Sequence, residues 1–208
     1  LRQMIDCAKD LLSVKKPDWS KWHATLTEAR EKFWKEDEEK VSSEIARSPV
    51  RGCVFGKAVG DLVKAYPGTS VVLDSFTGSL WASDRVRATF GGQVIDSAGW
   101  SGVGHGIGMG FGISTARPNA PVVVVMGDGG MGIDGMNIET AIRFNKPVIY
   151  LVYNDSQWMN SYWELLYSKG FGVDNRMIEN QRYDLMFEPI GCHGEWVTEA
   201  SQLKPALE

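Results

Sequence analysis

Three short apolar runs predict the centre of a sheet. They cover residues 70–73, 122–126 and 148–153, and β-branched side chains are frequent in them. Short runs with no regular alternation of apolar and polar positions are typical of parallel strands that helices cover on both faces. We therefore expect a parallel sheet between residues 70 and 153.

Helical segments alternate with these runs. Residues 51–66 predict a helix that ends at Pro67-Gly68, and residues 136–145 fit a crossover helix between the last two runs. Strand, loop, helix and strand in this order form a βαβ unit. Several such units make an α/β domain with a doubly wound parallel sheet and helices on both faces.

Residues 1–48 differ from the rest, because they are charged and rich in helix-forming residues. Within residues 21–40, apolar side chains recur at steps of three and four positions, the spacing of an amphipathic helix. These side chains are Trp22, Leu26, Ala29, Phe33 and Trp34. We expect residues 1–48 to form a helical linker from a preceding domain and residues 49–208 to form the α/β domain.

Both ends of the sequence have the character of interior segments. The first residue is Leu1, inside a helix-like stretch, and residues 202–208 begin another helix with no capping glycine and no following strand. We expect the sequence to be part of a longer polypeptide, with the α/β domain incomplete at its C-terminal end.

The composition narrows the choice of partners. With a net charge of −4, the chain lacks the basic surface that binds nucleic acids or anionic membranes. Its apolar runs are too short to span a bilayer. Cys7, Cys53 and Cys192 fit neither a disulfide framework nor a zinc motif, which favours a reducing compartment. We expect a cytoplasmic protein with no nucleic acid and no membrane partner.

Polar residues directly follow two of the apolar runs. Asp128 lies in Gly127-Asp128-Gly129-Gly130 after the second run, and Asn154 follows the third. The carboxyl ends of parallel strands meet at one edge of a sheet, where α/β domains bind ligands. Carboxylate and amide oxygens suit Mg²⁺, and the two glycines after Asp128 let backbone N–H groups approach a phosphate closely. A simpler interpretation is a glycine-rich βα turn in which Asp128 caps the helix.

The segment from Gly127 to Asn154 resembles the motif of thiamine-diphosphate (ThDP) enzymes, which runs from GDG through a crossover helix to Asn-Asn after the next strand. The chain is thus identified as a diphosphate-binding domain of this superfamily, of the acetolactate synthase and benzoylformate decarboxylase type. The resemblance implies ThDP and Mg²⁺ as cofactors, with Asp128, Asn154 and the backbone carbonyl of Ser156 as metal ligands. Asp155 departs from the motif, which usually has a second Asn there.

The same resemblance assigns further residues to the cofactor. Residues 99–112 match the glycine-rich segment around its bend, where Val103 would wedge between the two rings as the catalytic residue and the Ser101 carbonyl would accept the pyrimidine amino group. Thr77 and Gly78 would contact the diphosphate together with Gly127, Gly129 and Gly130. The alternative for residues 99–112 is a nicotinamide-type loop, but it lacks the upstream strand and the downstream acidic residue that such a loop requires.

Two segments indicate a branch of the superfamily. Residues 135–140 (GMNIET) and 143–147 (RFNKP) most resemble 2-hydroxyacyl-CoA lyases and oxalyl-CoA decarboxylases. The resemblance implies a carbon-carbon lyase that cleaves a 2-hydroxyacyl-CoA into an aldehyde or ketone and formyl-CoA. The alternatives are an acetolactate-synthase-like or benzoylformate-decarboxylase-like enzyme acting on a 2-oxoacid, and a non-catalytic subunit that keeps the fold.

The resemblance also implies partners. In the superfamily a glutamate from a pyrimidine-binding domain activates the cofactor, and no segment of this chain resembles that domain. We expect the glutamate to come from such a domain or subunit, a homodimer or tetramer as the assembly, and a CoA thioester as a possible substrate. The apolar residues after the metal site, Trp158, Met159, Tyr162 and Trp163, are candidates for an acyl pocket or a lid, and the alternative is packing under a surface loop.

Overall fold

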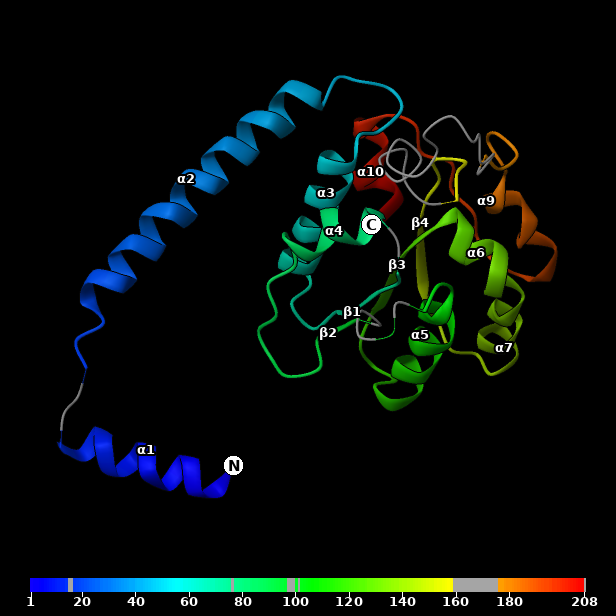
Figure 1. Ribbon diagram of the computed structural model, residues 1–208. Helices are drawn as coiled ribbons and strands as arrows, with labels where there is room; N and C mark the ends of the chain where they lie inside the picture. Colours follow the sequence, from blue (N-terminus) through cyan, green and yellow to red (C-terminus); the bar gives the residue numbers. More distant parts are fainter. Residues whose placement is uncertain (15–16, 76, 97–99, 101, 159–175, 208) are drawn as a thin grey trace, which may run out of the picture. The chain divides into compact units, whose positions relative to one another are not determined.

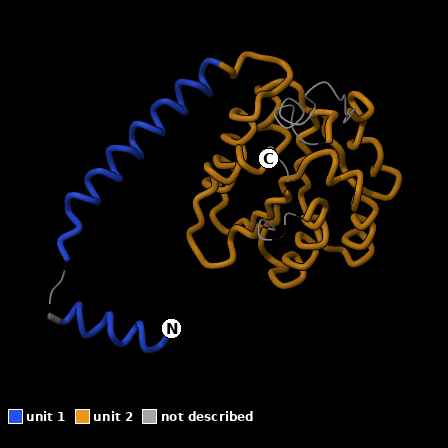
Figure 2. Tube along the Cα trace, viewed as in Figure 1, with its two compact units in different colours: residues 1–43 blue, residues 44–208 orange. Residues whose placement is uncertain are grey.

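The computed structural model describes residues 1–14, 17–75, 77–96, 100, 102–158 and 176–207. The chain divides into two compact units, residues 1–43 and 44–208 (Figure 2). The boundary expected from the sequence was at residues 48–49. The assignment of the first part as a linker and of the second as an incomplete diphosphate-binding domain remains a prediction.

The first unit consists of helices. Helix α1 covers Arg2–Val14, and α2 covers Ser20–Glu44, so that α2 ends just inside the second unit. The helix predicted over residues 21–40 is therefore confirmed. Three of its regularly spaced apolar side chains, Trp22, Leu26 and Phe33, are exposed.

A sheet of parallel strands forms the centre of the second unit. Its order is β2 (Val94–Asp96), β1 (Ser70–Leu73), β3 (Val122–Gly127) and β4 (Ile149–Tyr153). Parallel pairing joins each neighbouring pair. The three predicted strands are confirmed. Strand β2 was not predicted, because its three residues at the sheet edge are too short for a recognisable apolar run.

Successive residues of β1 and β3 point to opposite faces of the sheet and build two cores. Val71, Leu73, Val123 and Val125 belong to one core, and Val72, Val124 and Met126 to the other. All seven are at most 2% exposed. Each buried side chain of this size contributes about 1.5–3 kcal/mol. Helices cover both faces (Figure 1), which confirms the predicted doubly wound α/β fold.

Helices α3 (Gly52–Ala65) and α4 (Thr77–Ser83) cover the first face. Helix α3 confirms the prediction for residues 51–66. It approaches α4 through Gly52 and Gly56, where an added Cβ atom would collide with Trp81. The C-terminal helix α10 (Ala200–Leu207) also contacts α3.

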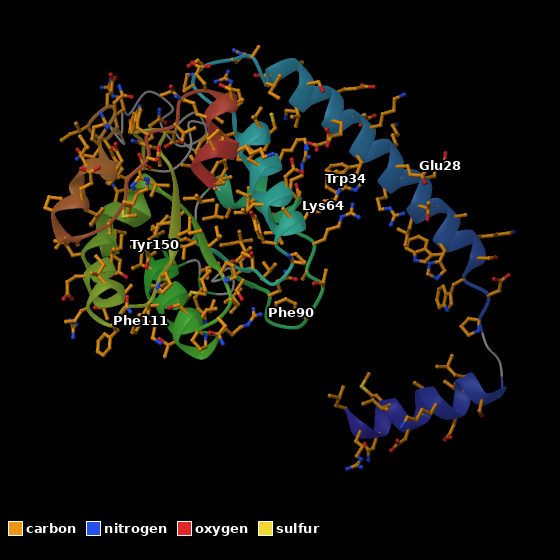
Figure 3. The ribbon with its side chains drawn as sticks, turned by 180° about the vertical axis from the view of Figure 1, so that it is seen from behind. Glu28, Trp34, Lys64, Phe90, Phe111 and Tyr150 are labelled. Carbon is orange, nitrogen blue, oxygen red and sulfur yellow. The ribbon has the colours of Figure 1, made fainter. Side chains whose placement is uncertain are left out.

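Helix α5 (His105–Ala116) lies on the second face and was not predicted as a helix, because its many glycines suggested a loop. The glycines instead allow close packing. Gly106 and Gly110 lie one turn apart, and a Cβ atom on either would come within 3.0 Å of the Val124 side chain. On the outer side of α5, the ring of Phe111 lies 5.9 Å from that of Phe144 (Figure 3).

The crossover between β3 and β4 differs from the predicted helix over residues 136–145. It begins earlier, with α6 (Asp128–Asp134), and continues through a 3₁₀ turn (Gly135–Asn137) into α7 (Ile138–Arg143). The glycine cluster after β3 therefore belongs to a helix. Beyond β4, the described chain includes α9 (Tyr183–Met186) and a 3₁₀ turn over Glu188–Ile190.

Across the described ranges, no helix combines the length and the apolar character that a membrane crossing would need.

Candidate functional site

Asp128 and Asn154 occupy equivalent places at the carboxyl edge of the sheet. Gly127, the last residue of β3, pairs in register with Tyr153, the last residue of β4. Each polar residue therefore comes directly after a paired position. Because neighbouring strands lie about 4.8 Å apart, the two side chains start from adjacent points, as the sequence predicted.

The Asp128 carboxylate is buried and only half satisfied. Its side chain is 3% exposed, and Oδ1 accepts a hydrogen bond from the Gly129 N–H at 2.9 Å. Oδ2 is buried and finds no hydrogen-bond partner within the described part of the chain. Burial raises the pKa of Asp128, and backbone N–H groups, first that of Gly129 and then those of Ser156 and Gln157, oppose this shift. The helix-cap interpretation is not supported, because Gly127 occupies the N-cap position and Asp128 is the first helical residue.

Hydrogen bonds fix the Asn154 side chain. Its Oδ1 accepts from the Ser156 N–H at 3.1 Å and from the Ser156 hydroxyl at 3.3 Å. Its Nδ2 donates to the backbone carbonyl of Gln181 at 3.1 Å. These partners show which atom of the amide is the oxygen and which is the nitrogen. They also direct Oδ1 toward the turn that follows β4.

Ser156 forms that turn. Its φ of 58° lies in the left-handed region, which few residues other than glycine adopt. Its backbone carbonyl accepts the Met177 N–H at 2.8 Å. A carbonyl oxygen has two lone pairs, so a metal bound to Ser156 would share this oxygen with the hydrogen bond.

The donor types suit Mg²⁺, and Asn154 Oδ1, which has two lone pairs, would exchange the 3.3 Å bond from the Ser156 hydroxyl for the metal. One carboxylate, one amide oxygen and one backbone carbonyl are hard oxygen ligands, and Mg²⁺ fills the rest of its octahedral shell with water or phosphate. Among the residues with assigned positions, no cluster of three or more His, Cys, Asp or Glu side chains offers a different metal site. A cation would also compensate the unpartnered Oδ2 of Asp128, because a buried charge is costly without a counterion.

Asp155 adds negative charge to this edge. Partial desolvation, together with the charge of Asp128, raises the pKa of Asp155 to about 6, although the side chain remains accessible to solvent. Its position directly after Asn154 makes it the acidic neighbour of the predicted metal ligands. The local charge therefore favours a cation over a bare phosphate.

The glycines after Asp128 have tight surroundings. A Cβ atom on Gly129 would lie 3.3 Å from the indole ring of Trp158, and one on Gly130 would lie 2.5 Å from Asp74 Oδ2. Trp158 thus covers the start of α6, which places it beside the predicted metal site. The other three residues of the expected acyl pocket, Met159, Tyr162 and Trp163, lie outside the described residues.

The remaining predicted residues fall at the starts of α4 and α5. Thr77 and Gly78 open α4, shortly after the carboxyl end of β1. Val103 is half-buried and immediately precedes Gly104, the N-cap residue of α5. Ser101 lies outside the described residues. The structure thus gathers the described candidates at the ends of β1, β3 and β4 and at the start of α5.

Sequence reasoning missed three residues of this region. Asp74 directly follows β1 and is buried, and its position after an apolar run is the signal that identified Asp128 and Asn154. The Tyr183 hydroxyl donates to the Asp128 carbonyl, and the Gln181 carbonyl accepts from Asn154. These two residues carry no local signal, because they come from a distant segment.

A cavity of about 260 Å³ lies between α6 and the segment before α9. Its lining is mostly apolar and includes four methionines, Met131, Met136, Met177 and Met186. Tyr183 and Gln181 also line it. Since both of these residues bond to the predicted metal ligands, the cavity adjoins the site.

The family profile described as thiamine pyrophosphate enzyme, C-terminal TPP binding domain, matches residues 77–208. Similar proteins include the acetolactate synthase large subunit IlvG of Mycobacterium tuberculosis, which is 32% identical over 140 residues, 66% of this chain and 25% of that protein. The oxalyl-CoA decarboxylase of Escherichia coli K12 is 30% identical over 113 residues, 54% of this chain and 20% of that protein.

The 2-hydroxyacyl-CoA lyase 2 of Caenorhabditis elegans is 31% identical over 111 residues, 52% of this chain and 17% of that protein. The matched part of the chain thus spans at most a quarter of the length of these three relatives. Their names describe a synthase, a decarboxylase and a lyase.

Proposed function

The chain belongs to the thiamine pyrophosphate enzymes, through their C-terminal TPP-binding domain, and from this premise we propose that it holds ThDP through Mg²⁺ at Asp128, Asn154 and the Ser156 carbonyl. The observation that carries the proposal is the buried, unpartnered Oδ2 of Asp128 at the sheet edge where Asn154 also begins. A cation held by Asp128 would relieve this charge and would leave ligand positions for a diphosphate.

The chain's own residues bind and orient the cofactor. The N–H groups at the start of α6 would face the diphosphate end, where the helix terminus favours negative charge. Val103 would support the bend between the two rings. When bound, ThDP would supply the chemistry for making or breaking a bond to a carbonyl carbon, and the protein would contribute geometry and electrostatics.

The active site needs a second domain. We infer that a pyrimidine-binding domain, on the same longer chain or on another subunit, provides the glutamate that activates the cofactor. The active sites then lie between domains, in a homodimer or tetramer. Residues 1–208 by themselves should bind the cofactor only weakly and show no carbon-carbon cleavage.

The favoured reaction is carbon-carbon cleavage of an acyl-CoA. A 2-hydroxyacyl-CoA would yield an aldehyde or ketone and formyl-CoA, and oxalyl-CoA would yield CO₂ and formyl-CoA. The segments at residues 135–140 and 143–147 support this branch, as does the similarity to a lyase and a decarboxylase. The apolar cavity beside α6 is suited to an aliphatic acyl group.

A 2-oxoacid enzyme is the second candidate. The observation that favours it is the similarity to acetolactate synthase IlvG, which extends over 140 residues, compared with 113 for the oxalyl-CoA decarboxylase. Such an enzyme would release CO₂ from a 2-oxoacid and join the remaining acyl unit to a second 2-oxoacid molecule.

Product analysis on the assembled protein distinguishes these activities. Formyl-CoA from a 2-hydroxyacyl-CoA or from oxalyl-CoA supports the first candidate, and acetolactate from pyruvate supports the second. A protein that binds Mg²⁺-ThDP but turns over none of these substrates, with the pyrimidine-binding domain present, is a non-catalytic subunit. Absence of Mg²⁺-dependent ThDP binding would refute the proposal itself.

A further inference from the structure

Asp74 is a buried carboxylate outside the predicted metal site. It directly follows β1, and its side chain is 1% exposed. Its backbone N–H donates to the Val125 carbonyl at 2.9 Å and so extends the pairing of β1 with β3. Carboxylates are seldom buried without compensating hydrogen bonds or charges.

The compensation comes from the start of α5. The Gly104 N–H donates to Asp74 Oδ2 at 2.9 Å, and the Gly106 N–H donates to Oδ1 at 3.0 Å. Gly104 is the N-cap residue of α5 and has no side chain with which to cap the helix. Asp74, which follows β1 and lies 30 positions earlier in the sequence, therefore caps α5.

Glycines make this tertiary cap possible. Gly104 has a φ of 89°, which turns the chain into the helix at a conformation that side chains disfavour. A Cβ atom on Gly106 would lie 3.0 Å from Asp74 Cβ, and one on Gly130 would lie 2.5 Å from Asp74 Oδ2. The carboxylate thus lies where α5 and α6 both begin.

We propose that Asp74 is a positioning residue for the thiamine end of the cofactor site. By capping α5 it fixes Gly104, and through this residue it fixes the adjoining Val103. This role rests on the proposed function, which gives Val103 its place at the bend of the cofactor. Both hydrogen bonds of the cap go to α5, whereas Asp128 and Asn154 follow β3 and β4, so losing these bonds should affect Val103 more than the diphosphate end.

The cap itself is tested in the cofactor-free full chain. In Asp74→Ala and in the nearly isosteric Asp74→Asn, amide exchange at Gly104 and Gly106 should accelerate roughly ten-fold or more, because a charge-assisted bond is lost. The matched control is Gln93→Ala, which removes a buried side chain bonded to the Pro67 and Thr69 carbonyls beyond the other end of β1. Exchange unchanged in both Asp74 variants would overturn the proposal.

The effect on the site is tested with two probes on the assembled protein. For Asp74→Asn, the affinities for inorganic pyrophosphate with Mg²⁺ and for ThDP should both stay within about three-fold of wild type, whereas C2–H/D exchange of the bound cofactor should slow about ten-fold, because the cap acts on Val103. Gln93→Ala should leave both affinities and the exchange unchanged. Unchanged C2–H/D exchange in Asp74→Asn, or a comparable loss of pyrophosphate affinity, would overturn the positioning role.

The two proposals fail in different ways. If the wild-type assembly binds neither pyrophosphate nor ThDP, the proposed function is refuted, whatever the amide exchange of Gly104 and Gly106. If the wild type binds both and Asp74→Asn exchanges the C2 hydrogen of bound ThDP at the wild-type rate, the proposed function stands and the role of Asp74 is refuted.

Discussion

The Tyr183 hydroxyl donates a hydrogen bond to the backbone carbonyl of Asp128 at 3.3 Å, across 55 positions of sequence. Two residues earlier, the Gln181 carbonyl accepts the Asn154 side chain. The first residue of α9 and the segment just before it therefore contact both predicted metal ligands. Burial, together with the charge of Asp128, raises the pKa of Tyr183, so its hydroxyl stays protonated and able to donate at neutral pH.

Tyr183→Phe should weaken Mg²⁺-dependent ThDP binding about three- to ten-fold, the range expected when one hydrogen bond is lost. The Asp128 carbonyl would lose its partner, and the turn that carries the carboxylate would be held less firmly. Calorimetric titration of the assembled protein measures the change. Tyr150→Phe is the control, because the Tyr150 hydroxyl has no partner among the described residues, and it should leave the affinity unchanged.

Asp128→Ala should abolish ThDP retention, and Asn154→Ala should weaken it severely, because the diphosphate loses its bridge to Mg²⁺.

In the metal-free protein, removing the charge of Asp128 should instead stabilise the fold. Its pKa is raised by burial, so the ionised form is destabilising at neutral pH, and Asp128→Asn should raise the midpoint of thermal unfolding. Asp61→Ala, an exposed carboxylate paired with Lys57, is the control for both measurements. Retained Mg²⁺-dependent binding in Asp128→Ala would contradict the metal assignment.

Val103→Ala should retain ThDP with near-normal affinity and slow C2–H/D exchange roughly ten-fold or more, the scale of a lost near-attack geometry. Val103→Leu should be tolerated, because a wedge needs bulk. His105→Ala is the informative comparison, since His105 follows Gly104 and its ring lies against Gly102. If His105→Ala slows exchange and Val103→Ala does not, the wedge has been assigned two residues too early.

Tyr150→Phe should alter the dependence of stability on alkaline pH. Burial raises the pKa of Tyr150 from 10.0 to about 12, with smaller contributions from Cys192 and Asp134. An acid whose pKa is higher in the folded state destabilises the fold as pH rises through the unfolded and then the folded pKa. Wild type should therefore lose more free energy of unfolding between pH 10 and 12 than Tyr150→Phe, as measured by urea unfolding. Figure 3 labels Tyr150. Parallel losses in both proteins would contradict the burial of this hydroxyl.

Gly56→Ala and Gly112→Ala should change stability in opposite directions, although both glycines lie inside helices. A Cβ atom on Gly56 would collide with the Trp81 backbone, so we expect a loss of about 1–3 kcal/mol from overpacking. Gly112 faces open space, and alanine there should add up to about 1 kcal/mol from helix propensity. Chemical denaturation measures both changes. A stable Gly56→Ala protein would show that α3 and α4 can separate without cost.

Local patterns in the sequence determined the frame of the site. The apolar runs located β1, β3 and β4, since parallel strands that helices cover are rich in apolar side chains. Strands β1 and β3 are buried at every position, whereas β4 is only partly buried. Asp128 and Asn154 stood out because a polar residue directly after such a run must lie at a sheet edge. The parallel direction of the strands then brought the two ends together.

Only the tertiary structure decided which contacts complete that frame. Strand β2 is too short to be recognised and depends on pairing with β1. The glycines of α5 suggested a loop in the sequence. The structure shows that they let the helix pack closely on Val124. Asp74 and Tyr183 act on residues 30 and 55 positions away. No local pattern encodes such contacts, because their partners become neighbours only when the helices pack on the sheet.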